Sequence, residues 1–183
     1  MVMQRASKAP LTPTQTLACH YKYEVDMLNA TYAYLADGHY DKVISNAFIE
    51  SFCIHGRALM EFFHKGEEER RAQRYTDGGY NPLHIERGRN SLWVKLNNQI
   101  AHLRNDERAC DDKDKIGPLE RAELMDILAK HSQGFRAHMK AEYSTLQLPA
   151  IEQQVITSVT STGTTSSFAE EFRVVSVGRA DQR

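Results

Sequence analysis

The chain lacks long hydrophobic runs and any excess of positive charge. Its longest uninterrupted apolar run is five residues, 32–36, whereas a helix needs about 20 apolar residues to span a bilayer. We therefore expect no membrane segment. Lys and Arg number 23 against 24 Asp and Glu, which gives a formal net charge of −1. This balance argues against a protein that coats DNA or RNA broadly, because such proteins are usually basic.

Cysteine is scarce, and most cofactor motifs are missing. The three cysteines, Cys19, Cys53 and Cys110, are far apart and odd in number, so we expect no disulfide framework and a reducing, cytoplasmic location. The first ten residues have basic side chains but no apolar stretch after them, unlike a secretory signal. The sequence has no phosphate-binding loop, dinucleotide fingerprint, zinc knuckle or metalloprotease helix. We therefore expect neither a cofactor nor a metal.

What is present is typical of one soluble domain. The chain has 183 residues, of which 41% are hydrophobic and 26% charged, and a domain of this size buries enough surface to fold without cross-links. We expect a flexible N-terminus at 1–12, a helical domain at 13–148 and a low-complexity, disordered tail at 149–183. Within this tail, residues 157–167 are nearly all Ser, Thr or Gly, a composition that cannot offset the entropy of ordering.

Helical spacing dominates the domain. Four segments, 13–36, 41–64, 86–108 and 118–143, repeat apolar residues at steps of three and four, which is the pattern of amphipathic helices. Thr12 and Pro13 open the first segment as a cap and a first-turn proline, and Asp37-Gly38 closes it. Four such segments joined by turns predict an all-α fold, an antiparallel four-helix bundle.

The first segment carries two neighbouring stripes, which predict a wide buried face. One stripe consists of Tyr21, Val25, Leu28, Tyr32 and Leu35. The other consists of His20, Tyr23, Met27, Ala30 and Tyr34. In the second segment His55 falls within the apolar stripe, and we expect it to hydrogen-bond a neighbouring helix.

A polar stripe on segment 86–108 is the main candidate site. Lys95, Asn98 and His102 follow one another at steps of three and four, so they share one side of the helix. A lysine, an amide and an imidazole together are able to position a phosphate and move a proton. Glu50 and Arg57, seven residues apart on segment 41–64, would complete the site if their side faced His102.

Histidines of the last segment offer a different chemistry. His131 and His138 are seven residues apart and lie at the edge of its apolar stripe. Metal sites in helical bundles usually combine such histidines with carboxylates in Glu-x-x-His pairs. Residues 128 and 135 are Leu and Phe instead, so two histidines at the rim of the core are the simpler interpretation.

Two strings together resemble a group of small, mostly uncharacterised bacterial helical proteins and, through it, the HEPN superfamily. They are residues 48–63 (FIESFCIHGRALMEFF) and 96–108 (LNNQIAHLRNDER). The resemblance covers roughly residues 15–145. It implies a helical bundle that is often dimeric, and many superfamily members are metal-independent ribonucleases in toxin–antitoxin, abortive-infection or RNA-processing systems.

The superfamily motif is an arginine followed, after four to six residues, by a histidine. If His102 is that histidine, the arginine position falls at 95–97, which holds Lys95, Leu96 and Asn97. Lysine lacks the bidentate fork that arginine offers to phosphate. Superfamily members that lack the full motif are often interpreted as inactive binding or assembly modules.

Three functions follow from these observations. The first is a non-catalytic helical module that associates with itself or with a protein partner, in which Asn97, His102 and Arg108 are structural polar contacts. The alternative is a HEPN-like ribonuclease acting on RNA. There His102 would be the general acid or base, and Lys95, Asn97 and Arg57 would hold the phosphate. The third is a metal-dependent bundle enzyme that uses His131 and His138.

Overall fold

A computed structural model describes residues 11–66, 71–88, 91–100 and 116–152. These residues form helices, with no strand among them, so the all-α prediction is confirmed for the described part of the chain. No helix in these ranges is long and apolar enough to cross a bilayer. The predictions made for His102, Arg108, Cys110, most of the N-terminus and the Ser/Thr-rich tail lie outside the described residues.

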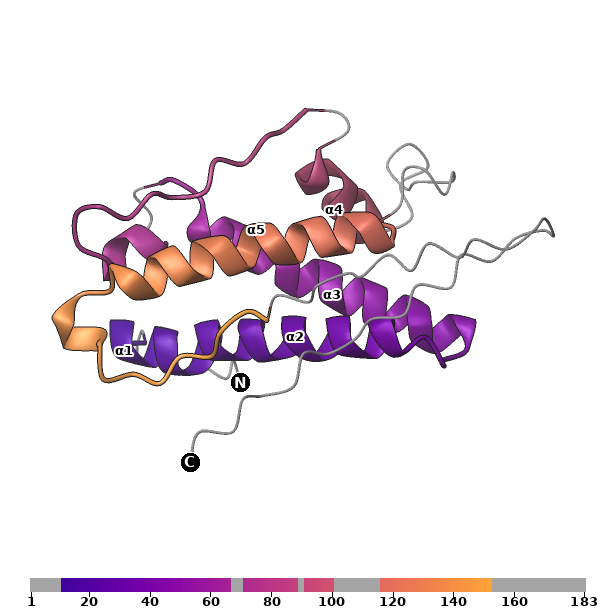
Figure 1. Cartoon of the computed structure of the whole chain (residues 1–183), viewed down its shortest axis with the longest axis horizontal. Helices are drawn as coiled ribbons and strands as arrows, with labels where there is room; N and C mark the ends of the chain where they lie inside the picture. The colour runs from indigo at the N-terminus through magenta and orange to yellow at the C-terminus, as the bar shows by residue number, and fades with distance from the viewer. Residues whose placement is uncertain (1–10, 67–70, 89–90, 101–115, 153–183) are drawn as a thin grey trace, which may run out of the picture.

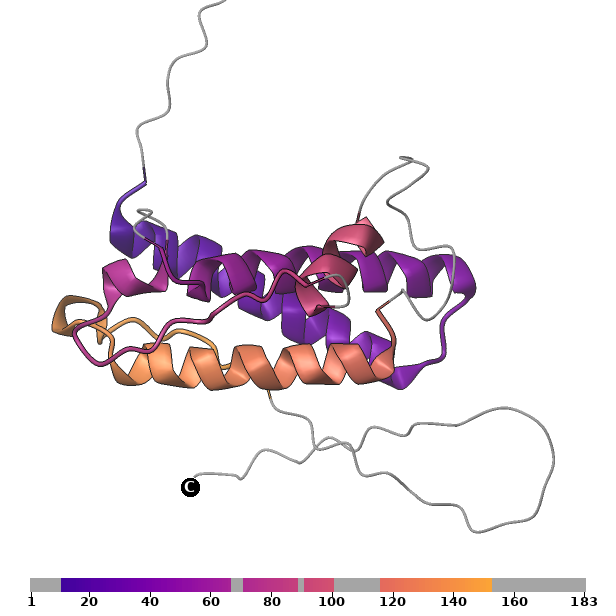
Figure 2. The same ribbon diagram turned by 90° about the horizontal axis from the view of Figure 1, so that it is seen from above.

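Three long helices lie side by side, and a short fourth lies near one end (Figures 1 and 2). The long ones are α2 (Lys22–Asp37), α3 (Lys42–Phe63) and α5 (Pro118–Ala137), and the short one is α4 (Leu92–Ile100). Helix α3 is central, because it contacts each of the other three. Short turns complete the fold: α1 (Pro13–Gln15), the π-helical turn η1 (Thr16–Tyr21), and the 3-10 turns η2 (Ala72–Tyr75) and η4 (Ala141–Tyr143).

The predicted limits of the first two helical segments are confirmed. Thr12 Oγ1 accepts from the Gln15 N–H at 3.2 Å while Gln15 Oε1 accepts from the Thr12 N–H at 2.9 Å, a reciprocal cap that satisfies two otherwise unpaired donors. Gly38 ends α2 with a φ of 69°, a left-handed conformation that favours glycine. Asp41 caps α3 by accepting from the N–H groups of Val43 and Ile44.

The start of α4 and the end of α5 differ from the predicted limits. Helix α4 begins at Leu92 rather than near Glu86, because the Ser91 N–H donates to Gly88 O in a turn, and Ser91 O then accepts the first helical bond from Lys95 N. Helix α5 ends at Ala137 instead of continuing to residue 143, and η4 follows as a separate turn.

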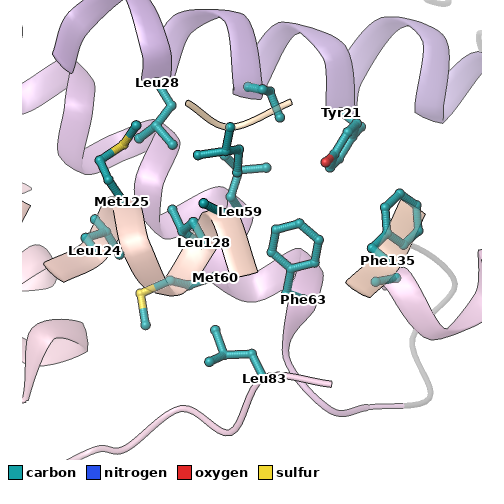
Figure 3. Close-up of a cluster of buried hydrophobic side chains, with 14 of the residues drawn as sticks. Tyr21, Leu28, Leu59, Met60, Phe63, Leu83, Leu124, Met125, Leu128 and Phe135 are labelled. Carbon is teal, nitrogen blue, oxygen red and sulfur yellow. The ribbon is translucent and has the colours of Figure 1, made fainter. Parts of the chain in front are cut away.

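The core is formed by side chains from all three long helices and from the segment around Leu83 (Figure 3). The first stripe of α2 is buried as predicted at Tyr21, Val25, Leu28 and Tyr32. The second stripe is not: Tyr23 is 53% exposed and Tyr34 49%. The prediction of a wide buried face was therefore wrong. Apolar spacing alone did not show which of the two stripes would be covered by other elements.

The chain returns to α2 after α5. Residues 144–152, here called the C-terminal strap, bury Leu148 and Ile151. The Asn29 side chain holds the strap by donating to Ala150 O at 2.9 Å and accepting from the Glu152 N–H at 3.2 Å. The packed part of the chain thus continues a few residues past the expected boundary at 148.

Candidate functional site

Arg57 joins α3 to α4. Its guanidinium carbon lies 5.3 Å from the centre of the Trp93 ring, within the range of a cation–π contact. Its Nε also donates to Glu61 Oε1 at 3.2 Å. Arg57 is therefore occupied by contacts within the chain and fastens α4 to the central helix.

Lys95, the cation of the predicted site, forms an ion pair with α5. Its Nζ donates to Glu120 Oε1 at 2.6 Å, and Glu120 Oε2 accepts from the Gly117 N–H at 3.1 Å. The lysine and glutamate side chains are 19% and 26% exposed. Partial burial opposes ionisation of Glu120, but the bonds from Lys95 and Gly117 outweigh it and hold the pKa of Glu120 below its ordinary value.

This ion pair predicts an acid-dependent loss of stability. Since the pKa of Glu120 is lower in the folded chain than in the unfolded chain, its contribution is present above the unfolded pKa of about 4.3 and is lost as the pH falls through the folded pKa. We expect Lys95→Met to lower the free energy of unfolding by about 0.5 kcal/mol at pH 7. Urea unfolding of the wild type and of Lys95→Met at a series of pH values measures this difference in the free energy of unfolding. A difference between the two proteins that stays constant down to pH 2.5 would contradict the assignment.

Among the residues that the structure describes, no other predicted site residue is bonded to the Lys95 side chain. The Asn97 side chain donates to Trp93 O on its own helix at 2.8 Å. Asn98 is half-buried, and Glu50 on α3 is exposed. His102 and Arg108 lie outside the described residues, so the proton-transfer role of His102 stays a prediction.

A groove of about 430 Å³ lies where α3, α4, α5 and residues 83–86 meet, with Ser91 also in its lining. We call it the α4 groove. Its apolar wall includes Met60, Leu83 and Trp93, and its lining contains Lys95 but not Arg57, Asn97 or Glu50. Of the residues proposed for the predicted site, the groove thus contains Lys95 but not its expected companions Arg57 and Glu50 on α3.

Acidic residues of the α4 groove were missed by the sequence reasoning. Glu86, Glu120 and Glu123 all line it. For Glu120 a signal existed, because Gly117-Pro118 opens a helix and position 120 is where a capping glutamate is favoured. Nothing in the spacing indicated that this glutamate would also reach Lys95 on another helix.

Three further histidines singled out by the sequence, His55, His131 and His138, contact residues of the core or the backbone. His55 is 7% exposed, and its Nδ1 shares a hydrogen bond of 2.6 Å with Glu24 Oε2 on α2, which confirms the predicted core histidine. His138 Nδ1 contacts Gly134 O at 2.9 Å. Burial lowers the pKa of His131, whose ring lies 6.3 Å from that of Phe63. Within the described ranges, no group of three His, Cys, Asp or Glu is arranged to hold a metal.

The exposed second stripe of α2 continues onto α3. The Tyr34 ring stacks on Phe48 at 4.9 Å, and the Tyr23 ring meets His55 edge-on at 5.4 Å. Helical spacing places the outward residues of α3 beside these contacts. We call this surface the α2–α3 face, formed by Tyr23, Met27, Ala30, Tyr34, Ile44, Ala47, Ser51, Ile54 and Ala58. None of these residues is ionisable at neutral pH, although 26% of the chain is charged.

Comparisons with known proteins add no relative. A scan against family models, a search of curated proteins and a search of solved structures each found no match.

Proposed function

We propose that this chain is a non-catalytic, HEPN-like four-helix module that self-associates through the α2–α3 face. The observation that carries the proposal is an exposed, mainly apolar surface, beside which the Glu24 carboxylate is bonded to His55. Ile44 is 43% exposed and Ile54 50%, in addition to the two tyrosines. Contiguous apolar surface of this kind marks interaction sites in soluble proteins, and tyrosine is enriched at such sites.

The lack of charge favours a second copy of the chain as the partner. In a two-fold dimer each residue faces the same patch on the other protomer, so a charged patch would repel itself. Partners of another kind are usually selected by complementary charge, and the α2–α3 face offers none. The resemblance to the HEPN superfamily, with its many dimers, supports the same choice.

The contacts of Lys95 with Glu120 and of Asn97 with Trp93 O favour a non-catalytic module over a ribonuclease. To hold a phosphate, the Lys95 ammonium would have to leave Glu120, and the Asn97 amide would have to leave Trp93 O. In their observed positions Lys95 joins α4 to α5, and Asn97 bonds the backbone of its own helix. The contact of Asn97 fits the structural role that the first hypothesis gives this residue.

Sedimentation of the full chain tests the association. We expect the wild-type chain to sediment as a dimer at about 50 µM. We expect Ala47→Glu to raise the dissociation constant at least tenfold, because a two-fold axis brings both new carboxylates into one apolar interface. Gln133→Glu adds the same charge at an exposed position of α5 and should leave the dimer intact. A monomeric wild type, or an Ala47→Glu variant that still dimerises equally well, would sink the proposal.

RNA cleavage tests the non-catalytic part separately. The purified chain is incubated with tRNA and total RNA beside a His102→Ala variant. We expect no cleavage that depends on His102. Cleavage by the wild type that the variant loses would establish the ribonuclease alternative, whatever the oligomeric state.

A further inference from the structure

The α4 groove lies apart from the α2–α3 face and has a different chemistry. None of its lining residues belongs to that face. Its walls come from four parts of the chain: Met60 on α3, Trp93 on α4, Ile127 on α5 and Leu83 before α4. The volume of about 430 Å³ falls within the range of small-molecule pockets, roughly 300–1,000 Å³.

Charge in the groove is mainly negative. Three carboxylates line it against one ammonium, that of Lys95, and His84 is the other titratable group in the lining. Glu120 neutralises Lys95 through their 2.6 Å contact. Glu86 and Glu123 remain, and neither forms an ion pair with any residue in the described ranges. This small region therefore carries more negative charge than the whole chain, whose net charge is −1.

Apolar surface and uncompensated carboxylates in one groove define what it would bind. Glu86 and Glu123 are exposed and therefore hydrated, so they favour a cation over a neutral molecule of the same shape and repel an anion. Trp93 adds an aromatic ring, although the Arg57 guanidinium already lies over it. A cation on an apolar body satisfies both parts of the lining, since its body covers the Met60 and Leu83 side chains while its charge meets the rim.

We propose that the α4 groove is a binding site for a small organic cation, an ammonium or guanidinium group on an apolar body. Glu86 and Glu123 bind the charged group, and Met60, Leu83 and Trp93 contact the body. The Lys95–Glu120 pair closes one side of the groove and contributes no net charge. The site does not depend on self-association, because its lining comes from one protomer.

The only tryptophan of the chain lies in the groove, so intrinsic fluorescence reports on its occupancy. The probes are 4-phenylbutylamine, the neutral 4-phenylbutanol and the anionic 4-phenylbutyrate, which share one apolar body. We expect a saturable change of Trp93 emission with the amine below about 1 mM, and affinities at least fivefold weaker for the alcohol and the acid.

Two variants measure how much the Glu86 and Glu123 carboxylates contribute to binding of the amine. Glu123→Gln keeps the shape of the side chain and should weaken binding of the amine about fivefold, the factor for one ion pair at about 4 Å in water. Glu86→Gln should act similarly. Asp126→Asn removes a charge from an exposed position of α5 outside the groove and should change nothing.

Several results would overturn the proposal. They are equal binding of amine and alcohol, no saturation up to 10 mM, and equal effects of Glu123→Gln and Asp126→Asn. A lysine-containing peptide that binds at least tenfold more tightly than the amine would replace the small molecule by a protein partner. Sedimentation of the same variants should show an unchanged oligomeric state, so failure here is separable from failure of the dimer.

Discussion

Phe135→Ala is expected to lower the free energy of unfolding by about 3–5 kcal/mol, the range for a truncated core aromatic. Phe135 has no exposed surface, and its ring lies within 6.3 Å of the rings of Tyr21, Phe62, Phe63 and Tyr80. It thereby joins α5 to α3, to the start of α2 and to the segment before α4. Since domains have only about 5–15 kcal/mol of stability, the loss consumes much of the total.

Urea unfolding followed by circular dichroism measures this loss. The control is Leu119→Ala on the same helix, where the side chain is 67% exposed and the expected change is below about 0.5 kcal/mol. Similar losses for the two variants would mean that α5 does not pack through Phe135 as described.

The crossing of α3 and α5 at Gly56 predicts a compensating pair of substitutions. A Cβ atom at Gly56 would lie 2.7 Å from Leu124 Cδ2, so Gly56→Ala should overpack the core. Overpacking lowers the free energy of unfolding by about 1–3 kcal/mol, and the higher helix propensity of alanine offsets part of this loss. Leu124 is fully buried, and Leu124→Ala should cost about 2–5 kcal/mol. The double variant should lose at least about 1 kcal/mol less than the two single losses added, because the new methyl group fills part of the new cavity.

A second glycine substitution provides the matched control for this cycle. Gly134 lies in α5, and nothing would lie within 4 Å of a Cβ atom there. Gly134→Ala should therefore stabilise the chain by about 0.5–1 kcal/mol through helix propensity alone. Additive losses in the Gly56 and Leu124 cycle would show that the two residues do not meet.

Local signals in the sequence predicted the fold best. Thr12 with Gln15, Asp37 with Gly38, and Asp41 each act within one helical turn, and each limit that they predicted is confirmed. The start of α4 was missed because the 86–91 region contains residues compatible with a helix, while a turn between Gly88 and Ser91 delays it. That turn depends on how residues 83–85 pack against the end of α3, which spacing along the chain does not encode.

In the candidate site, too, the sequence predicted local features but not the contacts between elements. Spacing placed Lys95 on a polar edge of its helix, and the structure pairs it with Glu120, 25 residues further along the chain. His55 was predicted correctly because an imidazole within an apolar stripe must find a polar partner. Tyr23 and Tyr34 were expected in the core because periodicity identifies an apolar side of a helix, whereas only the tertiary arrangement determines whether another element covers it.

The hydrogen bonds between Asn29 and the strap determine how the chain would respond to a mechanical force. Its two hydrogen bonds join α2 to backbone 121 and 123 residues further along the chain. A force applied beyond residue 152 is therefore transmitted first to this side-chain amide and to the buried Ile151, before it reaches α5. We expect a force applied at that end to detach the strap stepwise. The force would act on the helices of the core only after the two Asn29 hydrogen bonds have broken.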